Sequence, residues 1–245
     1  MPRFFIDKSG IEDSSLFILG DDARHIARSL RMAVGDEITV CDGEGMEYTA
    51  RLSKIRDDRC DADIISSAIS VREPKSKIKL FMAYPKSDKL EVIIQKAVEL
   101  GALEIVPFES SRCIKKPKAD KAAERTARLS RIAEEAAKQC GRAILPSVSL
   151  PLSFSEMIDS AKKAELPIFC YEGVGTVSLK AILDGFTTAP ETISVVVGCE
   201  GGFSDSEAKA AEEAGFRMAN LGPRILRCET APDYCLSALS YKFEL

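Results

Sequence analysis

The residues best suited to chemistry lie in two glycine-bearing segments of the C-terminal half of the chain. The first, Gly198 to Ser204, follows the apolar run Ile193 to Val197, and the second, Leu221 to Ala231, follows another strand-like run. Glycines allow backbone amides to approach a ligand closely, and open α/β sheets bind ligands beyond the carboxyl ends of their strands. Two such segments at adjacent strand ends predict a pocket, and the pocket indicates an enzyme.

The ionisable side chains of these segments are arginines and carboxylates. Arg224, Arg227 and Glu229 lie in the second segment, and Glu200 lies in the first. The single histidine, His25, is far from both, which argues against a Ser-His-Asp triad and against histidine acid–base chemistry. A pocket with so few acid–base groups suits a cofactor that brings its own reactivity. A sulfonium methyl donor is an example, since it must mainly be positioned against its acceptor.

Several other kinds of site are not supported by the sequence. The patterns G-x-G-x-x-G, G-x-x-x-x-G-K-[ST] and G-x-S-x-G are absent, which argues against a Rossmann site, a P-loop and a hydrolase nucleophile. Eight cysteines are scattered without a C-x-x-C pair, so we expect no metal site and interpret them as small buried side chains in a reducing cytosol. No apolar run has the length of a membrane span, and the N-terminus lacks a signal-peptide pattern. We therefore expect a cytoplasmic protein with no membrane partner.

Charge is unevenly distributed along the chain. Residues 1–72 carry 10 Lys and Arg against 14 Asp and Glu, residues 73–142 carry 16 against 10, and residues 143–245 carry 8 against 14. A basic middle third in a chain of formal net charge −4 indicates a surface that faces a polyanion. A solvated helix face is the alternative interpretation of the same charges.

Residues 1–72 have the pattern of a small β-rich domain, and the polar, proline-containing residues 71–77 are typical of a linker. Three strands are expected, over residues 36–42, 46–55 and 60–69, with an Asp-Gly hairpin turn after the first. A short helix is expected over residues 21–31. Its three arginines have helical spacing and are predicted to share one face: Arg24, Arg28 and Arg31.

From residue 78 onward, strand and helix patterns alternate, which predicts a mostly parallel sheet covered by helices on both faces. The expected strands cover residues 78–84, 103–107, 166–171, 192–198 and 216–221. The expected helices cover residues 88–100, 119–141, 154–164, 204–214 and 230–242. Three of the helix starts are predicted from capping pairs, namely Asp88 with Glu91, Ser204 with Glu207, and Thr230 with Asp233.

Motifs along the whole chain resemble the RsmE family of SPOUT-class RNA methyltransferases. Gly198 to Ser204 is similar to the family's G-P-E-G-G-[FL]-[ST], and Leu221 to Ala231 matches L-G-x-R-I-L-R-x-E-T-A almost letter for letter. Shorter agreements follow in chain order: Pro2 to Phe5, His25 to Arg31 before Gly35-Asp36, Lys96 to Gly101, Ser111-Arg112, and Glu135 to Arg142 before Pro146. Position 199 departs from the pattern, because Cys199 replaces a proline that would fix φ and remove an amide donor.

The resemblance implies an α/β fold with two domains. Residues 1–72 would form a PUA-like β-barrel that helps to hold RNA, and residues 73–245 a SPOUT methyltransferase domain whose C-terminal part is a deep trefoil knot. S-adenosyl-L-methionine would lie in the knot, and the enzyme would be a homodimer with its pocket near the subunit interface. The implied cofactor-binding residues are Tyr171, Glu172, Gly198, Glu200, Gly201, Gly202, Leu221, Gly222, Ile225 and Leu226.

The implied activity is methylation of N3 of one uridine in 16S ribosomal RNA of the small ribosomal subunit. Arg227 and Arg224 would favour the deprotonated uracil, and Glu229 or Glu200 would accept the proton. The RNA-binding candidates are Arg3, Arg24, Arg28, Arg31, Arg112 and Arg142, with the helix around Arg125 to Arg131. Two alternatives remain open: a catalytically silent RNA-binding or ribosome-assembly factor of the same fold, and a methyltransferase of this class that acts on another RNA atom such as a ribose 2′-hydroxyl.

Overall fold

The computed structural model describes residues 1–86, 88–114 and 119–245, which form two compact units. Unit 1 comprises Met1–Glu73 and Ala137–Leu145, and unit 2 comprises Pro74–Ala136 and Pro146–Leu245. The chain first passes from unit 1 to unit 2 inside the predicted linker over residues 71–77. No helix of the described chain is both long and apolar enough to cross a membrane.

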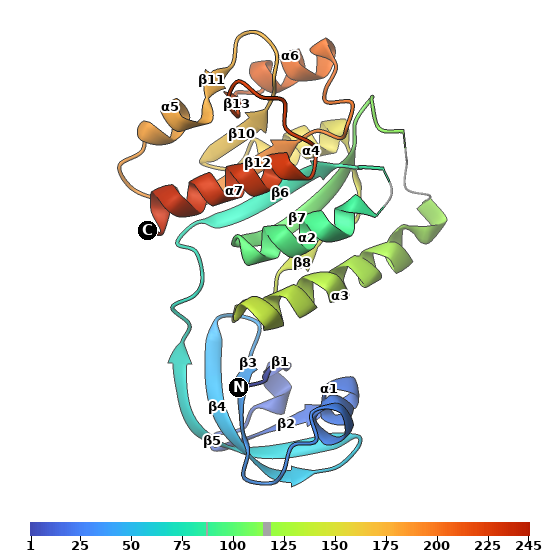
Figure 1. The fold of residues 1–245 in the computed structure, drawn as a ribbon, viewed down its shortest axis with the longest axis vertical. Helices are drawn as coiled ribbons and strands as arrows, with labels where there is room; N and C mark the ends of the chain where they lie inside the picture. The colour runs from blue at the N-terminus through green and yellow to red at the C-terminus, as the bar shows by residue number, and fades with distance from the viewer. Residues whose placement is uncertain (87, 115–118) are drawn as a thin grey trace. The chain divides into compact units, whose positions relative to one another are not determined.

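Unit 1 is built on a five-stranded sheet with the strand order β1-β3-β4-β5-β2 (Figure 1). Its strands are β1 (Arg3–Phe5), β2 (Ser15–Leu19), β3 (Glu37–Cys41), β4 (Met46–Ile55) and β5 (Arg59–Ile69). β1 pairs in parallel with β3, and the other pairs are antiparallel. The three strands predicted from alternating hydrophobicity are β3, β4 and β5, and Gly43 at φ 76° makes the turn between the first two.

The helical segment of unit 1 differs from its prediction. α1 (Gly20–Arg24) runs directly into a π-helical turn, η2 (His25–Ser29), and a short 3-10 turn, η1 (Lys8–Gly10), precedes β2. Arg31 lies beyond the helix with φ 51°, and a π turn changes the angular step between successive side chains. The prediction of one helical face shared by Arg24, Arg28 and Arg31 is therefore wrong.

Unit 2 contains an eight-stranded parallel sheet with the order β11-β13-β10-β12-β6-β7-β8, and β9 also pairs with β7. The strands are β6 (Lys77–Ala83), β7 (Ala102–Glu109), β8 (Ser147–Val148), β9 (Leu152–Ser153), β10 (Leu166–Cys170), β11 (Val177–Ser178), β12 (Thr192–Val197) and β13 (Arg217–Asn220). The five predicted strands are β6, β7, β10, β12 and β13. β12 is buried from Ile193 to Val197 and is apolar there except at Ser194, as expected for a central strand covered on both faces.

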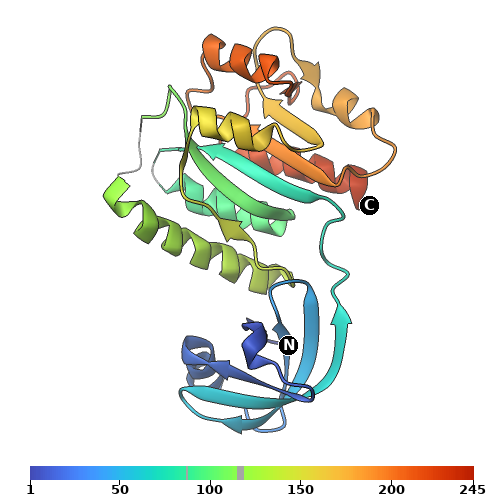
Figure 2. The same ribbon diagram turned by 180° about the vertical axis from the view of Figure 1, so that it is seen from behind.

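The helices of unit 2 lie on both faces of this sheet, as α2, α7 and α4 show in the two views of Figures 1 and 2. The helical segments are α2 (Lys89–Glu99), η3 (Ala119–Lys121), α3 (Ala122–Cys140), α4 (Phe154–Ala161), α5 (Leu179–Asp184), α6 (Asp205–Glu213) and α7 (Thr230–Phe243). α3 continues from unit 2 into residues assigned to unit 1. α2 and α7 pack against each other on one face, and α4 contacts β6, β7 and β12.

The three predicted capping pairs have different outcomes. Ser204 and Glu207 form the capping box at the start of α6. Asp88 precedes α2 without a side-chain capping bond. Thr230 is itself the first residue of α7, and Asp233 Oδ1 is buried without a hydrogen-bonding partner among the described residues. The last two predictions are therefore wrong, although both helices form where expected because their apolar faces are buried against neighbouring elements.

The two glycine-bearing segments do not follow adjacent strands. They follow β12 and β13, and β10 pairs in parallel with both and lies between them. The carboxyl ends of the three strands still meet at one edge of the sheet. Because β10 separates the two segments, the loop that follows it at Tyr171 is brought between them.

Candidate functional site

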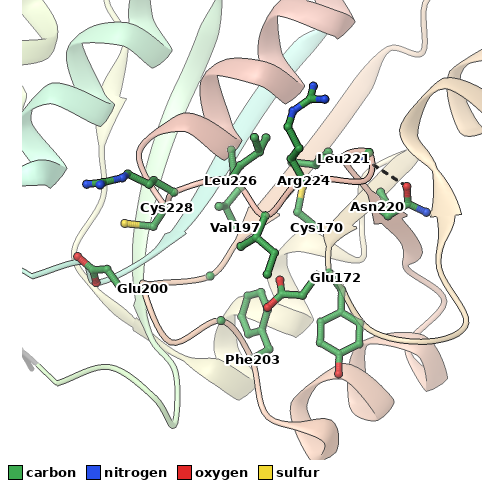
Figure 3. Close-up of a pocket in the computed structure, with 18 of the residues that line it drawn as sticks. Cys170, Glu172, Val197, Glu200, Phe203, Asn220, Leu221, Arg224, Leu226 and Cys228 are labelled. Atoms are coloured by element: carbon green, nitrogen blue, oxygen red, sulfur yellow. Dashed lines mark hydrogen bonds between the residues drawn. The ribbon is translucent and has the colours of Figure 1, made fainter.

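A pocket of about 730 Å³ opens at the carboxyl ends of β10, β12 and β13 (Figure 3). Three loops line it, within residues 170–176, 197–203 and 219–231, and Lys89 at the start of α2 completes the lining. The volume falls within the roughly 300–1,000 Å³ of small-molecule sites. The sequence predicted a pocket at the carboxyl ends of the strands that precede the two glycine-bearing segments, and the structure has one there, with β10 between those strands.

Apolar side chains form a rigid floor for this pocket. Phe203 is 3% exposed, and its ring lies 4.2 Å from that of Phe169 and 6.3 Å from that of Phe108. Val197, the last residue of β12, and Leu226, in the loop after β13, add aliphatic surface. The floor can take a flat apolar group while backbone amides and carbonyls of the loops remain available around it.

The glycines of the first segment are required by close packing. A Cβ at Gly198 would lie 3.1 Å from the Phe203 ring, and a Cβ at Gly202, which has φ 63°, would lie 3.1 Å from Glu172 Oε1. A Cβ at Gly201 would lie 3.0 Å from Arg112 Cβ. Each glycine thus allows a different neighbour to approach, and the segment can hold this shape only with small residues at these positions.

The predicted cofactor-binding residues are brought together with one exception. Those that line the pocket are Tyr171, Glu172, Gly198, Glu200, Gly202, Leu221, Gly222, Ile225 and Leu226. Gly201 does not line it, and its carbonyl instead accepts a hydrogen bond of 2.9 Å from Arg112 Nη1. Arg112, predicted to bind RNA, therefore ties the β7–α3 loop to the first glycine segment.

Glu172 is the free carboxylate of the pocket. Within the described chain its carboxylate forms no hydrogen bond or ion pair, although it lines the cavity. In Figure 3 it lies between Phe203 and Arg224. An unpaired carboxylate beside an apolar floor and glycine-rich backbone fits a ligand that carries hydroxyl or ammonium groups together with a flat ring. These features match the chemical groups of S-adenosylmethionine.

Glu200 and Glu229 are paired with a lysine that sequence reasoning missed. Lys89 Nζ lies 3.2 Å from Glu200 Oε1 and 3.0 Å from Glu229 Oε2. The Lys86 backbone amide also donates to Glu200, at 3.1 Å. Burial alone would raise the pKa of each carboxyl, but hydrogen bonds from backbone amides and from Lys89 lower both pKa values on balance. Both groups are therefore stabilised as carboxylates, and Glu229 does not line the pocket.

Arg224 and Arg227 line the pocket and are exposed. Neither guanidinium forms an ion pair or a hydrogen bond within the part of the chain that the structure describes. Figure 3 shows Arg224 extending away from the Val197 and Phe203 floor. Both arginines are thus available to a group that approaches the mouth of the pocket.

Asn220 is a second residue that the motifs did not single out. Its side-chain amide nitrogen donates to Thr176 Oγ1 at 3.2 Å, and its oxygen accepts from the Gly222 amide at 3.4 Å (Figure 3). Asn220 therefore joins the loop after β10 to the loop after β13. The Asn-x-Gly spacing at the end of a strand is the signal that would have indicated this turn.

Cys199 is buried in the wall of the pocket, at 6% exposure. Its thiol interacts with that of Cys113 and lies 3.9 Å from Ser110 Oγ. The hydrogen bond from Cys113, with further bonds from the Gly201 amide and Ser110, lowers the pKa of Cys199 to about 6 despite its burial. The hydrogen bonds around Cys199 therefore favour its thiolate form more than burial disfavours it.

Of the five arginine candidates of unit 1, Arg31 is exposed beyond the helix, and the other four fall into two groups. Arg3 and Arg142 are largely buried, and they pair with Glu47 at 3.1 Å and with Glu73 at 2.8 Å. Arg24 and Arg28 are exposed and pair with Asp21 and Asp57. Exposed pairs contribute little to stability, so they can exchange their partners for phosphates more easily than the buried pairs can.

Comparisons with known proteins match most of the chain. A family model described as RNA methyltransferase domain matches residues 72–240, and one described as RNA methyltransferase PUA domain matches residues 18–65. The ribosomal RNA small subunit methyltransferase E of Bacillus subtilis (strain 168) is 35% identical over 251 residues, which cover 100% of this chain and 98% of that protein. The chain belongs to the ribosomal RNA small subunit methyltransferase E family. The resemblance inferred from the motifs is therefore confirmed.

Solved structures agree with this assignment. A family member from Neisseria gonorrhoeae bound to S-adenosyl methionine has a TM-score of 0.87 at 30% identity, with 99% of this chain and 98% of that chain covered. A methyltransferase from Legionella pneumophila in complex with the bound cofactor SAM has a TM-score of 0.85 at 29% identity, with 98% and 96% covered. The predicted fold class, a PUA-like domain followed by a parallel-sheet α/β methyltransferase domain, is confirmed.

Among the described residues, no cluster of three or more His, Cys, Asp or Glu could hold a metal ion.

Proposed function

We propose that this protein is an S-adenosyl-L-methionine-dependent methyltransferase that modifies N3 of a specific uridine in 16S ribosomal RNA. The observation that carries the proposal is the pocket that the Gly198–Ser204 and Leu221–Ala231 segments form together. The same segments carry the motifs of the family, and relatives of this fold bind S-adenosylmethionine. When bound, the cofactor supplies an electrophilic methyl group.

The residues of this chain would hold the cofactor through three features. Val197, Phe203 and Leu226 offer apolar surface, the glycine-rich backbone offers amides and carbonyls, and Glu172 offers a free carboxylate. The walls leave the mouth of the pocket to the exposed residues Arg224, Ile225 and Arg227. A base that enters from this side would meet two guanidinium groups that are unpaired within the described chain.

The arginines are the proposed catalytic groups. Uracil N3 must lose its proton to solvent before or during methylation, and the resulting anion places negative charge on O2 and O4. Arg224 and Arg227 would stabilise that anion, because positive charge aimed at developing negative charge lowers the barrier. The lowered pKa values of Glu200 and Glu229 make both carboxylates weak bases. We therefore assign the catalytic function to Arg224 and Arg227, and Glu229 has an indirect role.

RNA contact, assembly and topology belong to the same proposal. Residues 1–72 and the basic α3 would bind the ribosomal RNA, and two chains would associate as a homodimer. The strand order β13-β10-β12 is compatible with the trefoil knot implied by the family resemblance. Light scattering of the purified protein tests the dimer, with twice the 26.7 kDa chain mass as the expected result.

The activity is tested by methyl transfer from labelled S-adenosylmethionine to small ribosomal subunits that lack the modification, followed by identification of the nucleoside. We expect labelled 3-methyluridine. A 2′-O-methylated nucleoside would instead support a methyltransferase of this class with another target atom. Absence of transfer by a folded protein that still binds RNA would support the catalytically silent assembly factor.

A further inference from the structure

We propose that Lys89 is a positioning residue, which holds Glu200 and Glu229 so that Arg224 and Arg227 remain unpaired for the RNA base. This inference rests on the proposed function, since it assigns the purpose of the free arginines to methyl transfer. It adds a residue that lies outside both glycine-bearing segments and more than 100 positions before them.

The position of Lys89 lets it join two loops that are separate in sequence. Glu200 follows β12, and Glu229 immediately precedes α7, yet one ammonium group contacts both carboxylates, at 3.2 and 3.0 Å. The hydrogen bonds that Lys89 donates to Glu229 and, next in effect, to Glu200 raise the pKa of Lys89. The lysine therefore stays charged, and it stabilises the approach of two carboxylates that would otherwise repel each other.

The place of Lys89 in its helix also indicates a specific role. It is the first residue of α2, where the partial positive charge of the helix N-terminus disfavours a cation. Acidic residues suit a helix N-terminus better. Here they come from other loops, as Glu200 and Glu229, and they pair with Lys89. An ordinary surface lysine would be more stable near the C-terminal end of the helix.

Lys89 determines which cations the carboxylates contact. Glu229 lies two residues after Arg227, in a turn where the amides of Thr230 and Ala231 both donate to the Arg227 carbonyl. Apart from Lys89, the Glu229 carboxylate accepts only from the Cys228 thiol, at 3.2 Å, and from its own backbone amide within the described chain, so the next cation along the sequence is Arg227. Lys89 binds this carboxylate instead, and it binds Glu200 on the side of the pocket where Cys228 lies (Figure 3).

Removal of the lysine should therefore affect the charge at the pocket mouth in two ways. One positive charge is lost, and the Glu229 carboxylate loses its cation and can pair with a guanidinium group, while Glu200 keeps its bond from the Lys86 amide. The remaining potential would favour the uracil anion less, which would raise the apparent pKa of uracil N3 in the complex. The rate of methyl transfer would fall, and its dependence on pH would shift upward, while the cofactor floor made by Val197 and Phe203 stays intact.

The test compares Lys89→Met, Lys89→Arg and the double variant Lys89→Met/Glu229→Gln in the full-length protein. Lys162→Met is the matched control, because it removes an exposed lysine that pairs with Asp159 at 2.6 Å and does not line the pocket. For each variant, calorimetry gives the Kd for S-adenosylmethionine, and assays on unmodified small subunits give kcat, KM and the pH profile.

We expect Lys89→Met to lower kcat about tenfold, the effect of losing one charged hydrogen bond, with less than a threefold change in cofactor Kd. The rising limb of its pH–rate profile should move to higher pH. Lys89→Arg should retain activity because a guanidinium can bond both carboxylates. The double variant should recover part of the lost rate, since the released Glu229 carboxylate is gone, and Lys162→Met should behave as the unmodified protein.

Three outcomes would overturn the proposal. Parallel losses of cofactor affinity and kcat without recovery in the double variant would make Lys89 a structural clamp only. Inactivity of Lys89→Arg equal to that of Lys89→Met would indicate that the lysine itself contacts the substrate. An unchanged pH profile would exclude an effect on the uracil anion.

A crystal structure of the Lys89→Met variant tests the positioning role of Lys89 independently of the methyltransferase activity. We expect the Glu229 carboxylate to pair with Arg227 or Arg224 in the variant. Unaltered positions of Glu200 and Glu229 would refute the positioning role even if the unmodified protein transferred no methyl group. Failure of the unmodified protein in the assay, with this rearrangement present, would count against the proposed function alone.

Discussion

At the scale of single residues, the site separates charges that are close in sequence. The string from Arg224 to Glu229 contains two arginines and a carboxylate within six residues, a pattern that usually predicts local ion pairs. The structure pairs the carboxylate with Lys89 and leaves the arginines without partners in the described chain. This division gives the pocket mouth a positive character within an overall acidic protein.

Arg227→Ala should lower turnover about 100- to 1,000-fold, the usual cost of removing one group that stabilises developing charge. The Kd for S-adenosylmethionine should change little, because the floor and the glycine-rich backbone remain. Methyl-transfer assays and calorimetry on the same preparation check this. Arg217→Ala is the control, since that arginine is exposed at the start of β13. Equal losses of affinity and turnover for Arg227→Ala would refute the catalytic assignment.

The three cysteines that line the pocket should differ in reactivity. The bond from Cys113, with those from Gly201 and Ser110, lowers the pKa of Cys199 to about 6, whereas burial raises the pKa of Cys228 to about 12. The thiolate is the reactive form. Iodoacetamide labelling of Cys199 should therefore rise through about pH 6 and level off above it, and Cys228 should stay unlabelled at neutral pH.

Mass spectrometry across a pH series measures this labelling, with Cys170 as a further pocket cysteine for comparison. S-adenosylmethionine should slow the reaction of Cys199, because the bound cofactor would cover the wall that this residue forms. Labelling of Cys199 and Cys228 with the same pH dependence would contradict the assigned hydrogen bonds. Labelling unaffected by the cofactor would place the cofactor elsewhere.

At the scale of elements, sequence periodicity predicted most of unit 2 but not the relative placement of its loops. The strand and helix patterns indicated β6, β7, β10, β12 and β13, because short, largely apolar runs alternate there with helical periodicity. The order of these strands depends on contacts between residues far apart in sequence, and local sequence patterns do not reveal those contacts. The insertion of β10 between β12 and β13, and the contact of Lys89 with both loops, became visible only in three dimensions.

The first glycine segment gives a prediction with an internal control. Gly202→Ala introduces a Cβ at φ 63°, 3.1 Å from Glu172 Oε1, whereas Gly215→Ala introduces one at φ 91° with no atom within 4 Å. Both variants should lose about 1 kcal/mol of unfolding free energy, because alanine disfavours positive φ. Only Gly202→Ala should also weaken binding of S-adenosylmethionine.

Chemical denaturation and calorimetry of the two alanine variants measure these effects separately. If both variants bind the cofactor with normal affinity, the close approach of Gly202 to Glu172 is not needed for binding. If both lose affinity, the effect arises from general destabilisation rather than from the pocket.

Glu207 connects α6 to the β7–α3 loop. Its carboxylate accepts bonds from the amide and hydroxyl of Ser111, at 2.7 and 2.8 Å, while it also closes the capping box with Ser204. Burial would raise its pKa, but the bonds from Ser111 and Ser204 outweigh it and hold the pKa below 4.5. This stabilisation is present above the unfolded pKa and is lost as the pH falls through the lower folded pKa.

Glu207→Gln should therefore lower the unfolding free energy at pH 7 by about 1–3 kcal/mol, the cost of weakening bonds to a buried charged group. The variant should also lose less stability than the unmodified protein as the pH falls below about 4.5. Urea unfolding at several pH values checks both effects. Identical pH dependence in the two proteins would show that Glu207 is not the group that titrates.

At the scale of the whole molecule, charge segregation indicated a basic region, but not which arginines are available. Arg3 and Arg142 were expected to bind RNA, yet they occupy largely buried pairs with Glu47 and Glu73. Sequence cannot distinguish such a pair from an exposed one, because the acidic partners lie 44 and 69 positions away. The exposed arginines Arg128 and Arg131 of α3 are better candidates for phosphate contact.

The double variant Arg128→Gln/Arg131→Gln should therefore bind ribosomal RNA with a weaker dependence on salt. Each lost phosphate contact should reduce the slope of log K against log salt by about 0.7–0.9, because fewer counterions are released. Arg142→Gln should instead lower the unfolding free energy by about 3–5 kcal/mol, since it leaves the Glu73 carboxylate buried without its cation. Filter binding from low to high salt, with denaturation in parallel, separates the two effects. A flat response of the unmodified protein to salt would refute the polyanion-facing surface itself, because the basic block would then contact no phosphates.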